Sequence, residues 1–490
     1  SGESPLPRRH GVGIDRTTGA ASDGALYEHE FLPRGTRFTI RITAEGRDGE
    51  KMRREQSDGI PEPASSESVK KILEFIVDVL TSGAICLGGR TGSGQGTIQV
   101  IEPKLRRTAK TTDAGTPAEP ADVLDALIGE DAEGTPIPLE LGGWSLEEPA
   151  RITIDWWSPT GIFVAEDDEL TKQRKTAKED ENKEKGINEE VHEVIYPLRD
   201  PSEEWENAQL LIPGTSIRGA LRSRASRIAR TVLAAQDELP TCASHDLHEQ
   251  IAAEPNLVRY MFGCTEYRGA ITVHDCLSTK RGKRIEVTHN AIDRWTGGVI
   301  EGGLFTEAVY LGTKWQPITI DIDLRQLLNN IEAEKGEAKD KPKEAEKQET
   351  QQDGQKDDQQ REHVYAPYAR AAYVLLGLVL AELSAGTLPL GSRSTRGLGQ
   401  VVVSSIDIRG SAHEGAKIPT KERFGDRALD HPGTAASPPP QDRCDAQRRL
   451  AGAVLGFLKT IDGAEQWSER LDEAPANGGA RSKGEENTHE

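Results

Sequence analysis

Residues 211–222 read Leu211-Ile212-Pro213-Gly214-Thr215-Ser216-Ile217-Arg218-Gly219-Ala220-Leu221-Arg222, a proline–glycine turn that leads into a helix. Through position 230 the expected helix carries arginines and no acid; they are Arg218, Arg222, Arg224, Arg227 and Arg230. Backbone N–H groups at a helix start bind anions, and arginines one turn apart extend such a site along a phosphate chain. The stretch therefore predicts contact with an RNA or DNA backbone. The alternative is an ordinary amphipathic helix with solvated arginines.

The composition indicates globular domains separated by polar linkers. The chain has 490 residues, of which 35% are hydrophobic and 29% charged. Its net charge of −20 would argue against a nucleic-acid partner only if the acids were spread evenly along the chain. They are not, because the segment between Asp113 and Arg151 contains acids and no base. A second basic cluster follows the arginine helix; it comprises Lys280, Arg281, Lys283 and Arg284. The distribution of charge is compatible with an RNA groove.

Cysteine use and hydropathy predict a cytoplasmic protein with no membrane partner. Five cysteines and the lack of a charged-then-apolar leader fit a reducing cytosol. The longest apolar run, residues 371–380, is too short to span a membrane.

An internal repeat organises the chain. Ile14-Asp15-Arg16-Thr17-Thr18-Gly19 recurs as Ile292-Asp293-Arg294-Trp295-Thr296-Gly297. Further on, Leu87-Gly88-Gly89-Arg90 recurs as Leu390-Gly391-Ser392-Arg393, with matching later glycines. Each Ile-Asp-Arg segment runs into an expected strand, at 37–42 and 315–320. Two related domains in one chain are the simplest account.

The repeat sets the expected domain boundaries. We expect the C-terminal part of a first domain over residues 1–105, an acidic Pro/Ala linker over 106–149, and a second domain over 150–408. The second domain contains charged insertions at 166–190 and 333–363, which we expect to be disordered, the first of them alternatively a solvated helix. Residues 409–490 are expected to be linker followed by an amphipathic helix. The second domain is expected to open with a strand whose apolar residues alternate at Ile152, Ile154 and Trp156, followed by the Pro-Gly helix. The first domain lacks this opening strand and helix, which are its N-terminal half.

The glycine loops do not match a dinucleotide or triphosphate loop. Those loops follow a strand and lead into a helix. Here the order is reversed: the apolar spacing of residues 70–80 and 373–383 predicts helices before the glycines, and strands are expected after them, at 97–101 and 401–403. Glycine lets a backbone approach a ligand closely, and N–H groups in such a loop can bind phosphate. The alternative is that the glycines only turn the chain.

Together these motifs resemble the RAMP superfamily, the RNA-binding backbone subunits of type III CRISPR-Cas effector complexes, here in a tandem form similar to types III-D and III-E. The resemblance rests on the Ile212–Gly219 signature, the doubled Ile-Asp-Arg segment and both glycine loops. It implies an α/β (α+β) fold of two ferredoxin-like or RRM-like domains in tandem. The residues it implies for RNA binding are Ser216, Arg218, Arg222, Arg224, His289, Arg294, Arg393, Arg396, Arg16 and Arg90.

The same resemblance implies a possible cleavage site in the loop before the Pro-Gly motif. There, family members that cut target RNA carry an aspartate that supports divalent-metal-dependent cleavage, by Mg or Mn. In this sequence that position falls on Val194 or Ile195, so Glu193 is the first candidate and Asp200 the second. The alternative is that both are surface acids of a loop, and the activity of the chain as an endoribonuclease stays open.

A possible structural zinc site comprises Cys242, His245, His248 and Cys264. A Cys-x-x-His start suits zinc, and some larger type III RAMP proteins resemble zinc-finger carriers in this region. The spacing from His248 to Cys264 is loose, so the alternative is that these residues hold no metal.

The resulting hypothesis is a backbone subunit that binds CRISPR guide RNA and presents it for pairing with target single-stranded RNA, together with other effector subunits. Sequence specificity then comes from base pairing. One alternative is a guide-RNA-processing RAMP endoribonuclease, which needs a histidine or similar acid–base pair, with His10 and His289 as candidates. The other is a non-catalytic assembly protein, which leaves the basic helix without a partner.

Overall fold

The computed structural model describes residues 6–16, 18–44, 66–82, 85–107, 135–142, 150–187, 191, 193–236, 246–335, 351–410, 421–431 and 440–471. The chain forms two compact units. One comprises Ser1–Thr36, Gly92–Gly94 and Pro149–Glu490, and the other Arg37–Thr91 and Gln95–Glu148. The first hairpin of the repeat therefore belongs to the same compact unit as the second copy.

The larger unit is built on an antiparallel sheet with the ferredoxin-like order of elements. In sequence these are β5 (Ala150–Trp157), α4 (Gly214–Ala235), β8 (Ile271–Val273), β13 (Ile318–Ile322), α8 (Gln351–Ser384) and β14 (Val402–Arg409). The strands lie in the order β14-β5-β13-β8, and β15 (Lys421–Gly425) extends the sheet beside β14. This strand–helix–strand–strand–helix–strand order confirms the predicted fold class.

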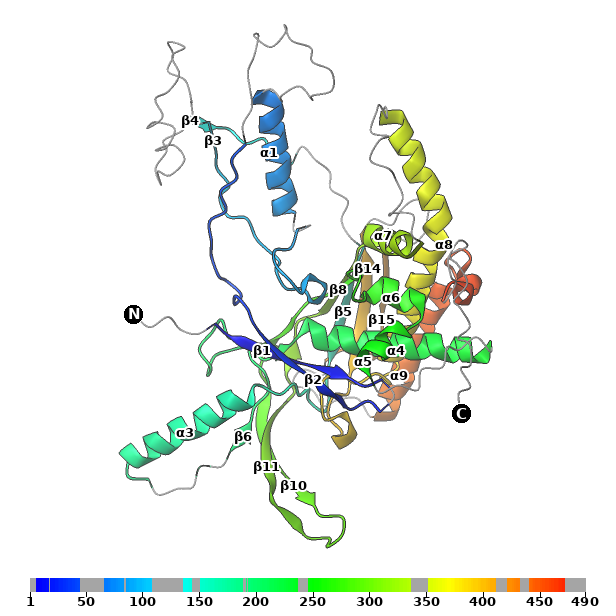
Figure 1. Ribbon diagram of the computed structural model, residues 1–490. Helices are drawn as coiled ribbons and strands as arrows, with labels where there is room; N and C mark the ends of the chain where they lie inside the picture. Colours follow the sequence, from blue (N-terminus) through cyan, green and yellow to red (C-terminus); the bar gives the residue numbers. More distant parts are fainter. Residues whose placement is uncertain are drawn as a thin grey trace, which may run out of the picture. The chain divides into compact units, whose positions relative to one another are not determined.

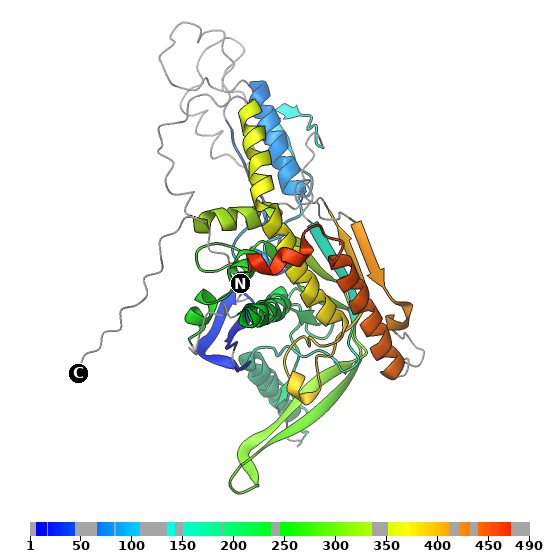
Figure 2. The same cartoon turned by 90° about the vertical axis from the view of Figure 1, so that its right-hand side faces the viewer.

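Alternating residues of β5 form the centre of the core. Ile152, Ile154 and Trp156 are buried, as their spacing predicted. They face the interior that α4 and α8 cover, and Figure 2 shows these helices packed beside the sheet. Trp156 also stacks on Trp315, with ring centroids 5.8 Å apart. The apolar run at 371–380 is thus the buried side of a core helix.

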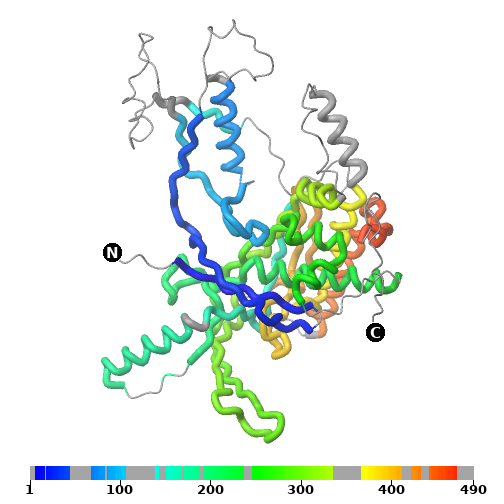
Figure 3. The backbone as a smooth tube through the Cα atoms, in the orientation of Figure 1, coloured from blue at the N-terminus to red at the C-terminus, as the bar shows by residue number. Residues whose placement is uncertain are grey.

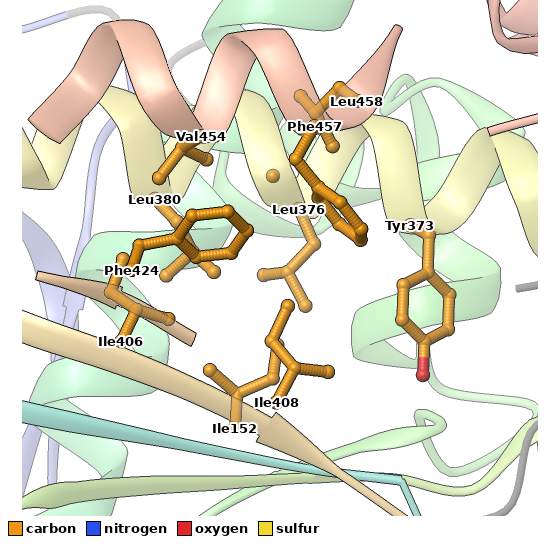
Figure 4. A pocket seen from close by; sticks show the side chains of 11 residues that line it. Ile152, Tyr373, Leu376, Leu380, Ile406, Ile408, Phe424, Val454, Phe457 and Leu458 are labelled. Carbon is orange, nitrogen blue, oxygen red and sulfur yellow. The ribbon is translucent and has the colours of Figure 1, made fainter. Parts of the chain in front are cut away.

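The amphipathic helix predicted near the C-terminus is α9 (Pro440–Leu458), and it packs on α8 of its own unit. Leu450, Val454 and Leu458 are buried in this contact. A small cavity between α8, α9 and the sheet is lined by apolar side chains and by Tyr373 (Figure 4). Such a lining is typical of an imperfectly filled core rather than of a polar ligand site.

Shorter elements complete the larger unit. The strands are β6 (Val194–Ile195), β7 (Leu211–Ile212), β9 (Cys276–Lys280) and β12 (Lys314–Trp315). The helices are α3 (Asp168–Glu184), α5 (Leu247–Ala252), α6 (Asn256–Phe262) and α7 (Leu324–Lys335). The strand expected at 315–320 is therefore divided between β12 and β13.

Two hairpins carry the repeated Ile-Asp-Arg segment, and their registers agree residue by residue. β1 (Arg8–Ile14) pairs with β2 (Ala21–Glu30), and β10 (Lys283–Ile292) pairs with β11 (Val299–Leu311). Ile14 lies opposite Ala21 and Ile292 opposite Val299, and both hairpins have an irregularity just before this pair. Figure 1 labels both hairpins, and the tube in Figure 3 follows the chain around each turn. The internal repeat is therefore a repeat of structure.

The smaller unit contains α1 (Ser66–Thr81) and the short pair β3 (Leu105–Arg107) and β4 (Thr135–Ile137). The predicted helix at 70–80 is confirmed, but the strands predicted at 37–42 and 97–101 are not formed. A strand needs a partner for its backbone groups. β13 of the second copy pairs with β5, and the described part of the first copy has no counterpart of β5.

Three further differences from the sequence prediction concern the insertions and the C-terminal part. The insertion at 166–190 forms helix α3, the solvated helix that the sequence left open. The predicted disorder of 333–363 is wrong at both ends, because α7 continues to Lys335 and α8 begins at Gln351; residues 336–350 lie outside the described residues. Beyond residue 409, β15 was not expected.

One described helical segment, Ala366–Ser384, is long and apolar enough to cross a membrane, but 78% of its apolar window is buried. That degree of burial is typical of a core helix.

A pH-dependent contact is expected at the sheet. Burial acts to raise the pKa of Asp321, but hydrogen bonds from His274 and Arg151 outweigh it and hold this pKa below its ordinary value. The ionised Asp321 therefore stabilises the folded protein. This stabilisation is complete above the ordinary aspartate pKa of about 4 and is lost as pH falls through the lowered pKa. Asp321→Asn should therefore lower the urea midpoint at pH 7 and have little effect at low pH. An equal loss at both pH values would contradict this.

Candidate RNA-binding site

The start of α4 already holds an anion from the chain itself. The Gly214 amide donates to Oδ1 of Asp275 at 2.8 Å, and the other carboxylate oxygen pairs with Arg9 at 2.9 Å. Carbonyl oxygens of Val273 and Ser93 lie so close to Gly214 that no side chain fits there. Residues 92–94 thus pack against this turn. The Gly214 amide thus has an internal carboxylate as its partner, and the predicted phosphate contact at this helix start stays a prediction.

The first arginines of α4 are also engaged within the protein. Arg218 donates to the carbonyl oxygens of Ile271, at 3.2 Å, and of Phe262. Burial lowers the pKa of Arg218 to about 10. Arg224 pairs with Glu382 and donates to the Thr387 carbonyl oxygen at 3.1 Å.

Arg222 belongs to a buried ion-pair group around Glu254. The Glu254 side chain is fully buried, accepts from Arg222 Nε at 3.0 Å and forms an ion pair with Arg16 of the first hairpin. Burial first, and the neighbouring Arg16 and Arg218 second, lower the pKa of Arg222 to about 9. For Arg16, burial first and Arg230 second lower the pKa to about 10. These side chains hold the first hairpin to the second copy.

The guanidinium groups of Arg218, Arg222, Arg224 and Arg16 thus have partners within the protein, and their predicted role in RNA binding stays a prediction. Ser216 lies half-buried in the first turn of α4, and its amide donates to the Pro213 carbonyl oxygen. Of the α4 arginines, Arg227 is exposed.

The tips of the two hairpins have the same turn but different surroundings. Oδ1 of Asp15 accepts from the Thr18 amide, and Oδ1 of Asp293 accepts from the amides of Thr296 and Trp295. These backbone donors lower the pKa of Asp293.

Asp15 is buried at 5% exposure, and the Arg16 amide donates to the side chain of Gln250 in α5. The second tip instead exposes Arg294 and 98% of Trp295. It is therefore the surface available to a partner.

A compact cluster of basic groups lies where the second hairpin meets the second glycine loop. Glu307 of β11 is only 1% exposed. Its carboxylate pairs with Arg393 Nε at 2.7 Å, with His289 Nε2 at 3.2 Å and with Arg396 at 3.8 Å. The His289 ring stacks on Phe305, with centroids 5.1 Å apart. The structure thus brings together three of the residues predicted to bind RNA.

The basic groups of this cluster remain accessible. The side chains of His289, Arg393 and Arg396 are 26%, 31% and 44% exposed, whereas their common acid is buried. Two arginines against one carboxylate leave a net positive charge at the surface. Sequence reasoning missed Glu307, since an acid inside a strand carries no signal of the cations that the fold brings to it.

The two glycine loops share an uncommon backbone feature. Arg393 has φ 65° and Arg90 has φ 58°, both in the left-handed region that favours glycine. Such a conformation costs an L-residue about 1–2 kcal/mol. The Leu390 amide donates to the Gly399 carbonyl oxygen, and the corresponding bond joins Leu87 to Gly96 in the smaller unit. The loops are equivalent, and the predicted contact of Arg90 with RNA stays a prediction.

The two acids predicted for metal-dependent cleavage have different surroundings. Glu193 is exposed and directly precedes β6, which pairs with β11 at Thr306 and Glu307. Asp200 is only 6% exposed, accepts from the Ser202 amide at 3.0 Å and pairs with Arg34. Asp200 therefore has a structural role in its loop. Catalysis by Glu193 or Asp200 stays a prediction.

The described part of the chain contains no group of three or more His, Cys, Asp or Glu side chains that could hold a metal ion. Of the predicted zinc ligands, Cys242 and His245 lie outside the described residues. The Cys264 thiol is 3.6 Å from Glu266, and the His248 amide donates to Asp246. The zinc site stays a prediction.

Comparison with known proteins identifies the family. The model of the RAMP superfamily matches residues 2–99 and 209–402, so the chain belongs to the RAMP superfamily. The chain is similar to part of a cryo-EM structure of the type III-B Cmr-beta bound to cognate target RNA, with 11% identity and a TM-score of 0.28. That match covers 54% of this chain and 62% of the other. No curated protein matches the sequence.

Proposed function

We propose that this chain is a guide-RNA-binding backbone subunit of a type III CRISPR effector. The observation that carries the proposal is the cluster of Arg393, Arg396 and His289 at the junction of β11 and the glycine loop. Basic groups that are fixed in place and partly exposed suit the binding of an RNA phosphate. Family membership supports the same role, and base pairing of the guide then selects the target RNA.

The packing of the two hairpins supports a backbone role. Within this chain the first tip lies against α5 and Glu254 of the second copy, through the amide and the guanidinium group of Arg16. The second tip has the same register and leaves Trp295 exposed. The first tip is packed on the neighbouring copy, whereas the equivalent second tip is exposed. This difference favours an assembly of successive domains, in which another effector subunit binds the second tip.

Replacing Arg393 and Arg396 together by alanine should weaken binding of single-stranded RNA. Each lost phosphate contact lowers the slope of log affinity against log salt by about 0.7 for a single strand, so the slope should fall by about 1.4. Titration of labelled RNA at several salt concentrations measures it.

The matched control is the double variant Arg448→Ala and Arg449→Ala, which removes two exposed charges from α9. Its slope should equal that of the wild type. Equal slopes in all three proteins would refute the proposed site.

A further inference from the structure

The smaller unit leaves the apolar side of its helix α1 exposed. Among the described residues of this unit the only buried side chain is an acid, Glu74 of α1, at 6% exposure. Ile72 of the same helix is 52% exposed, whereas Leu375, its equivalent in α8 by the repeat, is completely buried. An apolar helix side that stays in contact with water is typical of a surface that another element covers.

The polar side of α1 is already covered by its own unit. The Glu74 carboxylate accepts from the Glu140 amide at 2.9 Å. In the second copy the residue at the position of Glu74 is Gly377, where a side chain would collide with Leu458 of α9. The segment around Glu140 therefore covers the side of α1 that α9 covers on α8, and the cover still needed is that of the apolar side.

Two further segments of the smaller unit have the residue pattern of strands without the pairing. Ile40 and Ile42 alternate along the chain and are 49% and 47% exposed. Ile101, which follows the first glycine loop, is 64% exposed. The residues equivalent to the first two are Ile318 and Ile320 of β13, and both are buried. Because the residue type is the same in both copies, the difference in exposure reflects a neighbouring strand that only the second copy has.

The second copy shows which neighbours complete such a surface. β5 is antiparallel to β13 on one side and to β14 on the other, and Ile154 of β5 lies opposite both Ile318 and Ile406. The helix α4, which comes later in the chain than β5, packs on α8. One strand and one helix thus cover, in the second copy, the surfaces equivalent to those that the smaller unit exposes.

We propose that residues 37–42, the apolar side of α1 and residues 97–101 form a docking surface for a strand–helix segment of a partner polypeptide. The partner strand carries apolar residues at alternate positions, as β5 does, and adds between 37–42 and 97–101 so that both of its edges are paired. The partner helix covers the apolar side of α1. Strand addition of this kind satisfies backbone groups on both chains and buries alternate side chains. The interaction goes beyond RNA binding and does not require RNA.

The test follows amide hydrogen exchange in the full chain with and without a synthetic peptide that has the sequence of residues 150–158. At saturating peptide, exchange within 37–42 and 97–101 is expected to slow by about tenfold or more, because their amides become hydrogen-bonded. Exchange within β13 and β14 should not change, since β5 already pairs with both. A peptide that carries Ile152→Asp and Ile154→Asp should give no protection.

Two substitutions in the chain form a matched pair. Ile40→Asp places a charge on the docking surface, and Arg41→Ala changes the next residue, on the opposite face of the same segment. Both positions are exposed, so neither change should alter the folding of the chain. Protection by the peptide should be lost in Ile40→Asp and kept in Arg41→Ala.

Equal exchange with and without the peptide, or protection that survives in Ile40→Asp, would overturn the inference. Protection that develops without peptide as the chain concentration is raised would show that a second copy covers the surface, and would overturn the choice of partner. RNA binding is measured separately on the same wild-type protein. Its absence would refute the proposed function and leave this inference standing.

Discussion

Glu254→Ala is expected to lower the free energy of unfolding by about 3–5 kcal/mol, the range for breaking a buried ion pair by removing one partner. The Glu254 side chain is fully buried and is the common partner of Arg16 and Arg222. Its removal leaves two guanidinium groups without their acid in a poorly solvated place. Denaturant titration followed by intrinsic fluorescence measures the loss.

The control for this experiment is Glu249→Ala, which removes an exposed acid from α5. It should shift the denaturation midpoint very little. Arg16→Ala gives a second check, because it removes one cation while Arg222 keeps its acid, and it should destabilise less than Glu254→Ala. A Glu254→Ala protein as stable as wild type would show that Glu254 does not hold the first hairpin in place.

Gly214→Ala is expected to destabilise the protein by about 3 kcal/mol, at the upper end of the range for overpacking. A Cβ atom at Gly214 would lie 2.1 Å from the Val273 carbonyl oxygen and 2.7 Å from that of Ser93. Both atoms belong to backbone, which cannot rotate away as a side chain can. The shift in thermal midpoint and the yield of folded protein report the effect.

Gly219→Ala, further along α4, should have the opposite sign. A Cβ atom at Gly219 would have no neighbouring atom within 4 Å, and the residue is exposed inside the helix. Alanine there should stabilise by about 1 kcal/mol, because glycine is the poorer helix former. If both substitutions changed stability alike, the close approach at Gly214 would be disproved.

The features that the sequence predicted well depend on contacts between near neighbours in the chain. The Asp-Arg-x-Thr-Gly turn is closed by the aspartate's own side chain and the following amides, so its recurrence at 15–19 and 293–297 predicted an internal repeat, which the structure shows as two equivalent hairpins. The alternation of Ile152, Ile154 and Trp156 likewise predicted the central strand. These patterns are local, and residue spacing determines local geometry.

Predictions that failed depended on partners distant in the chain. Residues 37–42 alternate like a strand, yet a strand forms only where another supplies its hydrogen bonds. The charged segment from Gln351 continues the core helix α8, although its composition suggested disorder. Composition indicates how much apolar surface a segment can bury by itself, but it does not show that the segment extends a helix whose other part is buried in the core.

The sequence by itself determined the family, the internal repeat and the two glycine loops, because each depends on short-range spacing, and the resemblance to the family implied the ferredoxin-like fold. Only the tertiary structure decided which basic residues are accessible to RNA. Arg218 and Arg222 look like a phosphate-binding stripe in the sequence, but Phe262, Ile271 and Glu254 engage them. Arg393, Arg396 and His289 instead stay partly exposed around Glu307, since a side chain's partners are set by the packing of distant segments.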